Sequence, residues 1–281
     1  MIVYGKAIKE DIERSLKEEV RSRVKPPLLF ILTVGSNPVT EMFINVKKRF
    51  AQAIGVPVVD FRFPRTARES DVKEAILLMS RKENAGIIVQ LPLPAHLNTE
   101  EVLSVIPETH DVDVLGKEAL ARFESDTLSI LPPVIGAMKE ILFRNHVFLG
   151  NKKVVVVGRG RLVGAPAATW FKRHEAHVQV LGRDTRGITP LTKDADIIVL
   201  GAGSPGLLKP EMIRTGAVIL DAGVSESEGP TGREVTGDAD SQCAEKAGIF
   251  TPVPGGIGPV AVAFIFKNLL KLTQAKENAR H

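Results

Sequence analysis

Residues 153–170 read KVVVVGRGRLVGAPAATW, and this stretch decides the fold. The run from Lys153 to Val157 is short and mostly apolar, which is typical of a strand buried on both faces of a parallel sheet. Three glycines follow at positions 158, 160 and 164, and a helix is predicted from there to His174. A strand, a glycine turn and a helix in this order predict the first unit of a doubly wound α/β sheet.

Further apolar runs continue this sheet toward the C-terminus. Strands are predicted at 178–181, 197–200 and 218–220, and each of them leads into glycine. Bare backbone at the carboxyl ends of parallel strands allows a ligand to approach closely, so this edge of the sheet is a predicted ligand site. The glycines concerned are Gly182, Gly201, Gly203 and Gly223.

The N-terminal half also alternates strands with helices. Strands are predicted at 28–34, 58–63 and 86–90, and helices at 8–24, 39–54 and 69–82. This alternation indicates a second α/β layer structure.

The length of 281 residues favours two domains over one. A helix predicted at 134–142 would lead into the second domain, and a long apolar helix from 259 to about 274 could return to the first. The predicted fold class is therefore α/β with an N-terminal catalytic domain and a Rossmann-like, doubly wound domain. The predicted bounds are 1–140 with the C-terminal helix 259–281, and 141–258.

Composition narrows the class of protein. Hydrophobic residues make up 44% and charged residues 25% of the chain, which is close to the average for soluble globular proteins. The net charge of +4 comes from 37 basic and 33 acidic residues scattered along the chain, so binding to nucleic acid is not favoured. One cysteine, Cys243, allows no internal disulfide and no zinc cluster. Without an apolar signal core or a span of about 20 apolar residues, the expected location is the cytoplasm.

The glycine turn predicts a dinucleotide site. Its spacing is G-x-G-x-x-x-G, one residue longer than the usual fingerprint, and a structural turn without a ligand is the alternative that this motif alone leaves open. Where an NAD enzyme carries an acidic residue for the ribose, the sequence has Arg183 and then Asp184. Arg159 and Arg183 could contact a ribose 2′-phosphate, which favours NADP, whereas Asp184 could instead bind ribose. The candidate cofactor-binding residues are Gly158, Arg159, Gly160, Val163, Gly164, Arg183, Gly201 and Gly203.

Eight segments, in order and in spacing, resemble the bifunctional methylenetetrahydrofolate dehydrogenase/cyclohydrolase (FolD) family. The resemblance covers essentially the whole chain, and its most specific segment is the last one. The segments are VGSNPVTEMFINVKKRFAQAIGV, GIIVQLPLP, HDVDVLG, VVVVGRGRLVGAPAA, ADIIVLGAGSPG, GAVILDAGV, TGDAD and TPVPGGIGP.

The resemblance implies a set of site residues. Lys47 matches the family's catalytic lysine, Gln90 the glutamine of its QLPLP loop, and Asp113 the second aspartate of its DVD motif. It further implies that folate lies between the domains, that Asp113 binds its ring, and that Gln90 holds Lys47 near the one-carbon unit. On its own, Lys47 would be interpreted as a solvated lysine beside Lys48 and Arg49. The substrate-binding residues that the resemblance implies are Phe43, Pro254, Gly255 and Gly256.

The implied activity has two steps. NADP would oxidise 5,10-methylenetetrahydrofolate to the methenyl compound, and hydrolysis would then give 10-formyltetrahydrofolate, with no metal in either step. The family also implies a homodimer. The alternatives are a dehydrogenase without the hydrolytic step, a binding protein without turnover, and an unrelated dehydrogenase, such as a shikimate or amino-acid type, that shares only the glycine turn.

Several positions depart from the family's pattern. Phe43 stands where the family carries a tyrosine one turn before the lysine, so the hydrolytic step is the one in doubt. His110 is interpreted as a loop residue. The further departures are Gly160 for serine, His110 for lysine, Val114 for glycine, Leu131-Pro132-Pro133-Val134 for PCTP, and Val260-Ala261 for methionine-threonine.

Overall fold

The computed structural model describes residues 1–229 and 232–278, and the chain divides into two compact units. We call them the three-stranded unit, Glu10–Pro133 with Val262–His281, and the five-stranded unit, Met1–Lys9 with Val134–Ala261. The boundary suggested after residue 140 falls inside helix α6 (Pro133–Arg144). The first residues also belong to the five-stranded unit, because they pair with its edge strand: the Val3 amide donates to the Phe250 carbonyl at 2.8 Å.

The three-stranded unit is built on one parallel sheet in the order β2-β1-β3. Its strands are β1 (Leu28–Val34), β2 (Val58–Phe63) and β3 (Ala85–Val89), joined by α2 (Pro38–Ile54) and α3 (Glu69–Ser80). The chain therefore places β2 on one side of β1 and β3 on the other. Where the winding direction reverses, between the carboxyl ends of β1 and β3, open α/β sheets leave a crevice.

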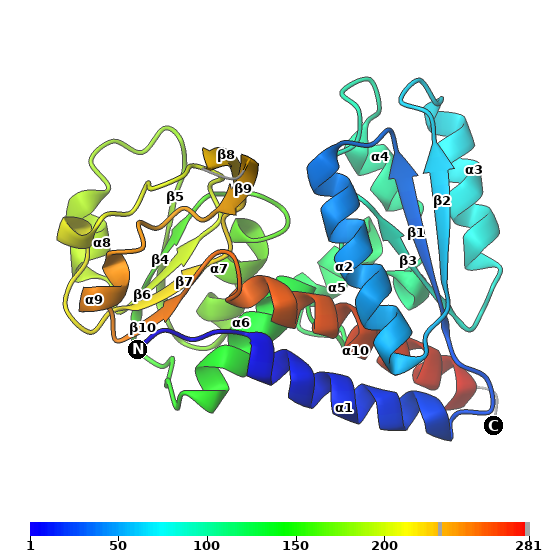
Figure 1. Cartoon of the computed structure of the whole chain (residues 1–281), viewed down its shortest axis with the longest axis horizontal. Coiled ribbons are helices and arrows are strands. Elements are labelled where there is room, and N and C mark those ends of the chain that lie inside the picture. The colour runs from blue at the N-terminus through cyan, green and yellow to red at the C-terminus, as the bar shows by residue number, and fades with distance from the viewer. Residues whose placement is uncertain (230–231, 279–281) are drawn as a thin grey trace. The chain divides into compact units, whose positions relative to one another are not determined.

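Both faces of this sheet are covered, as Figure 1 shows. On one face, alternate residues of β1 and β3 pack against α3 and α4 (Thr99–Ser104) in a single apolar cluster. The opposite face carries α2 and α10 (Ile257–Asn278), whose Phe50 and Phe266 rings stack at 5.1 Å. Leu269 of α10 lies over Gly86 of β3. α1 (Lys6–Ser22) presents the predicted apolar stripe, and its core-facing residues are Ile8, Ile12, Leu16 and Val20.

The five-stranded unit contains a parallel sheet in the order β10-β7-β6-β4-β5. Here too the first strand, β4, has its successor β5 on one side and β6 on the other, so the winding reverses between β4 and β6. Helix α7 (Gly164–Arg173) packs on β4 and β5. The strands are β4 (Lys153–Val157), β5 (His177–Leu181), β6 (Ile197–Leu200), β7 (Val218–Asp221) and β10 (Ile249–Thr251).

The structure adds elements that the sequence did not predict. β10 has only three residues before a proline, and β8 (Ser225–Gly229) pairs with β9 (Gly232–Thr236) in an antiparallel hairpin without an apolar run. Predicted bounds shift by a few residues elsewhere; α2 begins at Pro38 because Asn37 accepts a hydrogen bond from the Thr40 amide. The remaining short helices are α5 (Lys117–Glu124), α8 (Thr189–Asp194), α9 (Cys243–Lys246), η1 (Glu108–His110) and η2 (Pro210–Met212).

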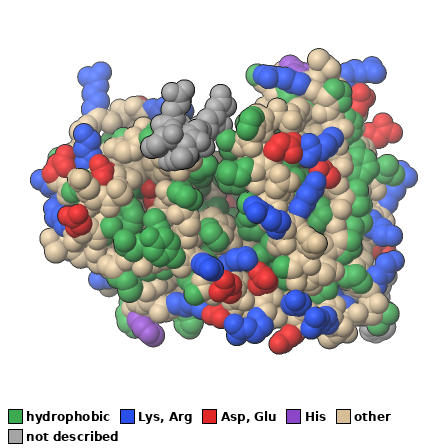
Figure 2. Space-filling view, in the orientation of Figure 1, with side chains coloured by type: hydrophobic (Ala, Val, Ile, Leu, Met, Phe, Trp, Pro, Cys, Tyr) green, Lys and Arg blue, Asp and Glu red, His purple; other side chains and the backbone are tan. Residues whose placement is uncertain are grey.

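The surface carries charges of both signs. On the face drawn in Figure 2, basic and acidic side chains are interspersed over both units. No helix in the described part of the chain is long and apolar enough to span a membrane. Within residues 1–229 and 232–278, no three metal-ligating side chains converge.

Candidate active site

Lys47 and Gln90 meet at the point where the three-stranded sheet reverses its winding. Lys47 projects from α2, and its Nζ donates to Gln90 Oε1 at 2.8 Å. Gln90 directly follows β3, is 9% exposed, and is held by two further bonds: its amide donates to the Leu32 carbonyl and its Nε2 to the Leu91 carbonyl. Lys48, by contrast, turns to Asp60 on β2. Lys47 is thus not the freely solvated lysine of the alternative interpretation.

Burial changes the proton equilibria of this cluster. Desolvation lowers the pKa of the Lys47 ammonium, and the charge of Asp113 offsets part of that effect. Desolvation likewise raises the pKa of the Asp113 carboxyl, and the charge of Lys47 opposes the rise. An amine and a carboxyl whose pKa values are shifted toward each other are suited to exchanging protons with a substrate near neutral pH.

The turn that presents Asp113 is built around a second carboxylate. Asp111 is 1% exposed, and its Oδ2 accepts from the Leu115 amide at 2.9 Å and from the Gly116 amide at 2.6 Å. Its Oδ1 has no hydrogen-bond partner among the described residues, and burial raises the pKa of Asp111 to about 7. Val114, where the resemblance leads us to expect glycine, adopts a left-handed φ of 57°, a conformation that favours glycine.

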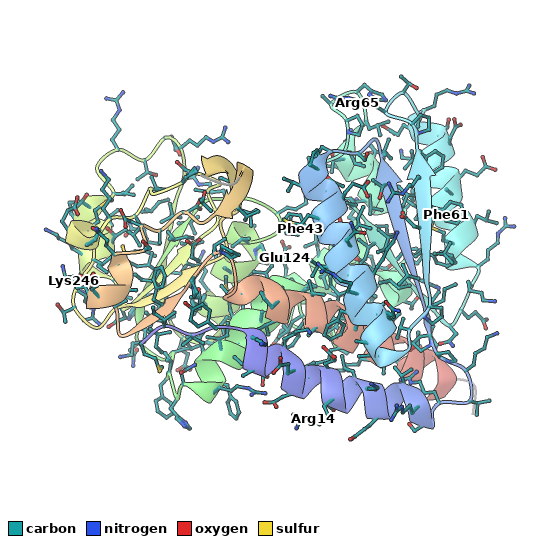
Figure 3. The ribbon with its side chains drawn as sticks, viewed as in Figure 1. Arg14, Phe43, Phe61, Arg65, Glu124 and Lys246 are labelled. Carbon is teal, nitrogen blue, oxygen red and sulfur yellow. The ribbon has the colours of Figure 1, made fainter. Side chains whose placement is uncertain are left out.

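The predicted substrate-binding residues fall in different units. Phe43 lies on α2, one turn before Lys47, and is half-buried (Figure 3). Pro254, Gly255 and Gly256 belong to the five-stranded unit, where they form the turn between β10 and α10. The Gly255 carbonyl there accepts from the Gly5 amide at 2.8 Å.

In the five-stranded unit the glycine turn follows β4 and closes against the end of β6. Gly158 has a φ of 109°, and a Cβ on it would lie closer than 3.0 Å to the Gly201 carbonyl oxygen. A Cβ on Gly164 would meet the Gly158 carbonyl just as closely, so α7 begins where only bare backbone fits. The Val163 side chain packs on Gly201.

Gly160, in contrast, faces open space, because no atom of the described residues lies within 4 Å of a Cβ built on it. A tight backbone turn with one open side, at the N-terminus of a ten-residue helix, fits a dinucleotide pyrophosphate. The serine that the family carries at this position would also fit without a clash.

Both candidate arginines lie at the end of β5: Arg183 follows Gly182 in the chain, and Arg159 reaches Gly182 from the glycine turn. Its guanidinium lies directly over Gly182 and forms an ion pair of 3.4 Å with Asp184. Arg183 is exposed, as are Arg159 and Asp184. The end of the second strand is where a ribose 2′-substituent is recognised in this fold, so a cation and an anion share that position.

His110 is a structural residue. It ends η1 instead of lying in a loop, and it is 6% exposed. Its Nε2 lies 3.2 Å from the Lys82 carbonyl oxygen, and burial lowers the pKa of the imidazole to about 4. The imidazole is therefore uncharged near neutral pH.

Two buried aspartates, Asp221 and Asp238, are not among the predicted site residues. Both are at most 1% exposed, and both accept hydrogen bonds from backbone amides around the carboxyl ends of β6 and β7. The segment TGDAD, which contains Asp238, was one of the motifs behind the family resemblance. That resemblance was the only signal available, because the amides that Asp238 binds lie 34 to 36 residues away in the chain.

Comparison with known proteins places the chain. Residues 3–113 match the profile described as tetrahydrofolate dehydrogenase/cyclohydrolase, catalytic domain, and residues 132–277 match its NAD(P)-binding domain. A Wolinella succinogenes protein named bifunctional protein FolD is 32% identical, over 98% of both chains, and its namesake from Halothermothrix orenii is 34% identical over 96% of both.

A solved structure gives the same answer. The Trypanosoma brucei N5,N10-methylenetetrahydrofolate dehydrogenase-cyclohydrolase, complexed with NADP and an inhibitor, is 30% identical and aligns with a TM-score of 0.94. The alignment covers 99% of this chain and 98% of that one. The chain therefore belongs to the tetrahydrofolate dehydrogenase/cyclohydrolase family and is not an unrelated dehydrogenase that shares only the glycine turn.

Proposed function

We propose that this chain catalyses the NADP-dependent oxidation of 5,10-methylenetetrahydrofolate and the hydrolysis of the methenyl product to 10-formyltetrahydrofolate. The observation that carries the proposal is the bond between Lys47 and Gln90, with the charge of Asp113 acting on Lys47, at the winding reversal of the three-stranded sheet. The Trypanosoma brucei protein, aligned over 98% of its chain, is named for this pair of activities.

The five-stranded unit would hold the cofactor. The amides at the start of α7 and the open side of Gly160 would receive the pyrophosphate, and Arg159 would contact the 2′-phosphate. Val163 and Gly201 would form the floor below the nicotinamide ribose, and Gly203 and Arg183 complete the proposed set. When bound, NADP accepts the hydride that leaves the methylene carbon of folate.

Hydrolysis adds water to the methenyl carbon, and a proton is lost from that water before the ring C–N bond opens. The lowered pKa of Lys47 suits it to take and return this proton, while Gln90 fixes the direction of its Nζ. Asp113 would bind the ring of the substrate through hydrogen bonds. Phe43, Pro254, Gly255 and Gly256 would supply contact surface for the ring and the segment beyond it.

One observation favours a narrower function. Phe43 carries no hydroxyl one turn before Lys47, so a polar partner that the family normally supplies is missing next to the hydrolytic lysine. A dehydrogenase with weak or absent hydrolysis is therefore the second candidate.

On the basis of the family resemblance we also propose a homodimer and a cytoplasmic location. The single cysteine, buried at Cys243, suits a reducing compartment. Analytical ultracentrifugation tests the dimer.

A paired assay on the purified protein tests the function. NADPH formation from methylenetetrahydrofolate is measured first, and the loss of methenyl absorbance without cofactor second. Activity in both is the expected result. Dehydrogenation alone would select the narrower enzyme, and silence in both with NADP still bound would make the chain a binding protein.

A further inference from the structure

The carboxylate of Asp238 organises the loop that follows β6. Its Oδ2 accepts from the Ala202 amide at 2.6 Å and from the Gly203 amide at 3.1 Å, and its Oδ1 accepts from the Ser204 amide at 2.6 Å. Asp238 is fully buried. Three successive amides that converge on one anion form a nest of the kind that binds phosphate in other proteins, and here the protein's own side chain fills it.

This arrangement decides which loop can take which part of a dinucleotide. The amides of residues 202–204 point inward to Asp238, so they are not available for a phosphate. The turn between Gly158 and Gly164, in contrast, keeps an open side at Gly160, at the start of a ten-residue helix. The loop after β6 instead packs against that turn, with its Gly201 carbonyl next to Gly158. The conformation of this loop therefore determines the surface beside the turn.

A second buried aspartate supports the first. Asp221, at the end of β7, accepts from the Gly223 amide at 2.9 Å and from the Ala239 amide at 2.8 Å, and so holds the residue that follows Asp238. Side chains at Gly223 and Gly237 would collide with Asp238 and Asp221 respectively. The two carboxylates therefore tie the ends of β6 and β7 to the segment that follows the β8–β9 hairpin.

We propose that Asp238 is a positioning residue for the nicotinamide half of the cofactor, acting through the β6 loop without touching the cofactor itself. The inference rests on the proposed function, because it takes the glycine turn as the pyrophosphate site. Loss of the Asp238 charge frees the loop next to β4 and leaves the adenosine end, at Arg159 and Gly182, as it was.

The variant Asp238→Asn tests this inference, because one carboxylate oxygen is replaced by an amide nitrogen that cannot accept, so at least one of the three backbone amides loses its acceptor. Asp240→Asn is the matched control: Asp240 accepts only from the Gln242 amide among the bonds that the described residues form with its side chain. Binding is measured by calorimetry with two probes, NADP and 2′,5′-ADP, the latter lacking the nicotinamide half. Methenyl hydrolysis, which needs no cofactor, reports on the rest of the fold.

The expected result is that Asp238→Asn binds NADP about 10- to 100-fold more weakly, as for lost hydrogen bonds to a charged group. The affinity for 2′,5′-ADP and the rate of methenyl hydrolysis stay within about twofold of the parent values. Asp240→Asn changes the affinity for neither probe. Equal weakening of both probes, or no change in NADP binding, would overturn the inference. A parent protein that binds neither probe would instead contradict the proposed function.

Hydrogen exchange on the unmodified protein gives a second test that does not depend on a variant folding. The amides of residues 202–204 are expected to be protected before NADP is added, since Asp238 already binds them, whereas those of residues 159 and 160 gain protection only with NADP. Fast exchange at 202–204 in the free protein would show that the nest is open and that Asp238 does not hold the loop.

Discussion

The two units share a winding pattern and use it in opposite ways. In each, the first strand has its successor on one side and the third strand on the other, so the crevice lies between the ends of the first and third strands. In the three-stranded unit side chains occupy that place, namely Lys47 and Gln90. In the five-stranded unit it is occupied by glycine backbone at 158 and 201. On the proposed function, one topology would thus serve acid–base chemistry in one unit and close binding of a ligand in the other.

The largest expected effect separates the two sites. Lys47→Ala should slow methenyl hydrolysis by about 10²- to 10⁴-fold, because the proton-transferring amine is removed, while NADP binding measured by calorimetry stays unchanged. Lys48→Ala, one residue along on the Asp60 side of α2, is the control. Full hydrolysis in Lys47→Ala would show that the Lys47–Gln90 cluster is not the site of the acid–base chemistry.

One added carbon atom should disrupt the glycine turn of the five-stranded unit. Gly164→Ala places a Cβ against the Gly158 carbonyl, so we expect NADP affinity to fall about 100-fold and the free energy of unfolding to fall by about 3 kcal/mol. Gly160→Ala makes the same change where the described residues leave space, and it should keep its stability. Calorimetry and denaturant unfolding measure both variants. If Gly164→Ala kept the NADP affinity and the unfolding free energy of the parent, the turn would not require bare backbone at this position.

A pH profile sharpens the contrast between the buried carboxylates of the two sites. Asp238 has both oxygens bonded, whereas Asp111 has one oxygen without a partner among the described residues and a pKa raised to about 7 from 3.8. A raised pKa in the folded state stabilises it below pH 4, and this stabilisation is lost as the pH rises through 7.

Relative to Asp111→Asn, the parent should therefore lose on the order of 4 kcal/mol of unfolding free energy between pH 4 and pH 7.5. Urea unfolding at several pH values measures the difference. Asp71→Asn, at a partly exposed position on α3, should follow the parent. Parallel curves for the parent and Asp111→Asn would contradict a protonated Asp111.

The smallest expected effect comes from adding a polar group next to Lys47. Phe43→Tyr restores a hydroxyl one turn before Lys47, and we expect methenyl hydrolysis to rise by about 3- to 10-fold as one hydrogen bond is gained. NADPH formation should change by less than about twofold. Phe61→Tyr, on β2, is the control. An unchanged hydrolysis rate would show that this hydroxyl has no part in the hydrolytic step.

How far the sequence could predict the molecule depends on the distance between interacting residues. The valine run and the glycines at 158–164 are local signals, so the strand, the turn and the helix were predicted within a residue or so. The pair of Lys47 and Gln90 spans 43 residues and was reached only through the family resemblance.

Contacts between two backbone segments are still harder to predict from the sequence. The pairing of residues 1–3 with β10 joins opposite ends of the chain, and nothing in the side chains of either segment announces it. The amides that Asp238 binds could belong to any residue types, so no sequence pattern could identify the bond.

The ion pair between Arg159 and Asp184 has a consequence for how the protein weighs its ligands. A 2′-phosphate that binds Arg159 must compete with the Asp184 carboxylate for the same guanidinium. The net gain in binding free energy is therefore smaller than for an arginine without a carboxylate partner. Because the pair is exposed, it contributes about 1 kcal/mol or less of free energy, so a 2′-phosphate would displace the carboxylate at little cost. The preference for a phosphorylated ribose over a plain one is therefore smaller than for an unpaired arginine, and ionic strength adjusts it.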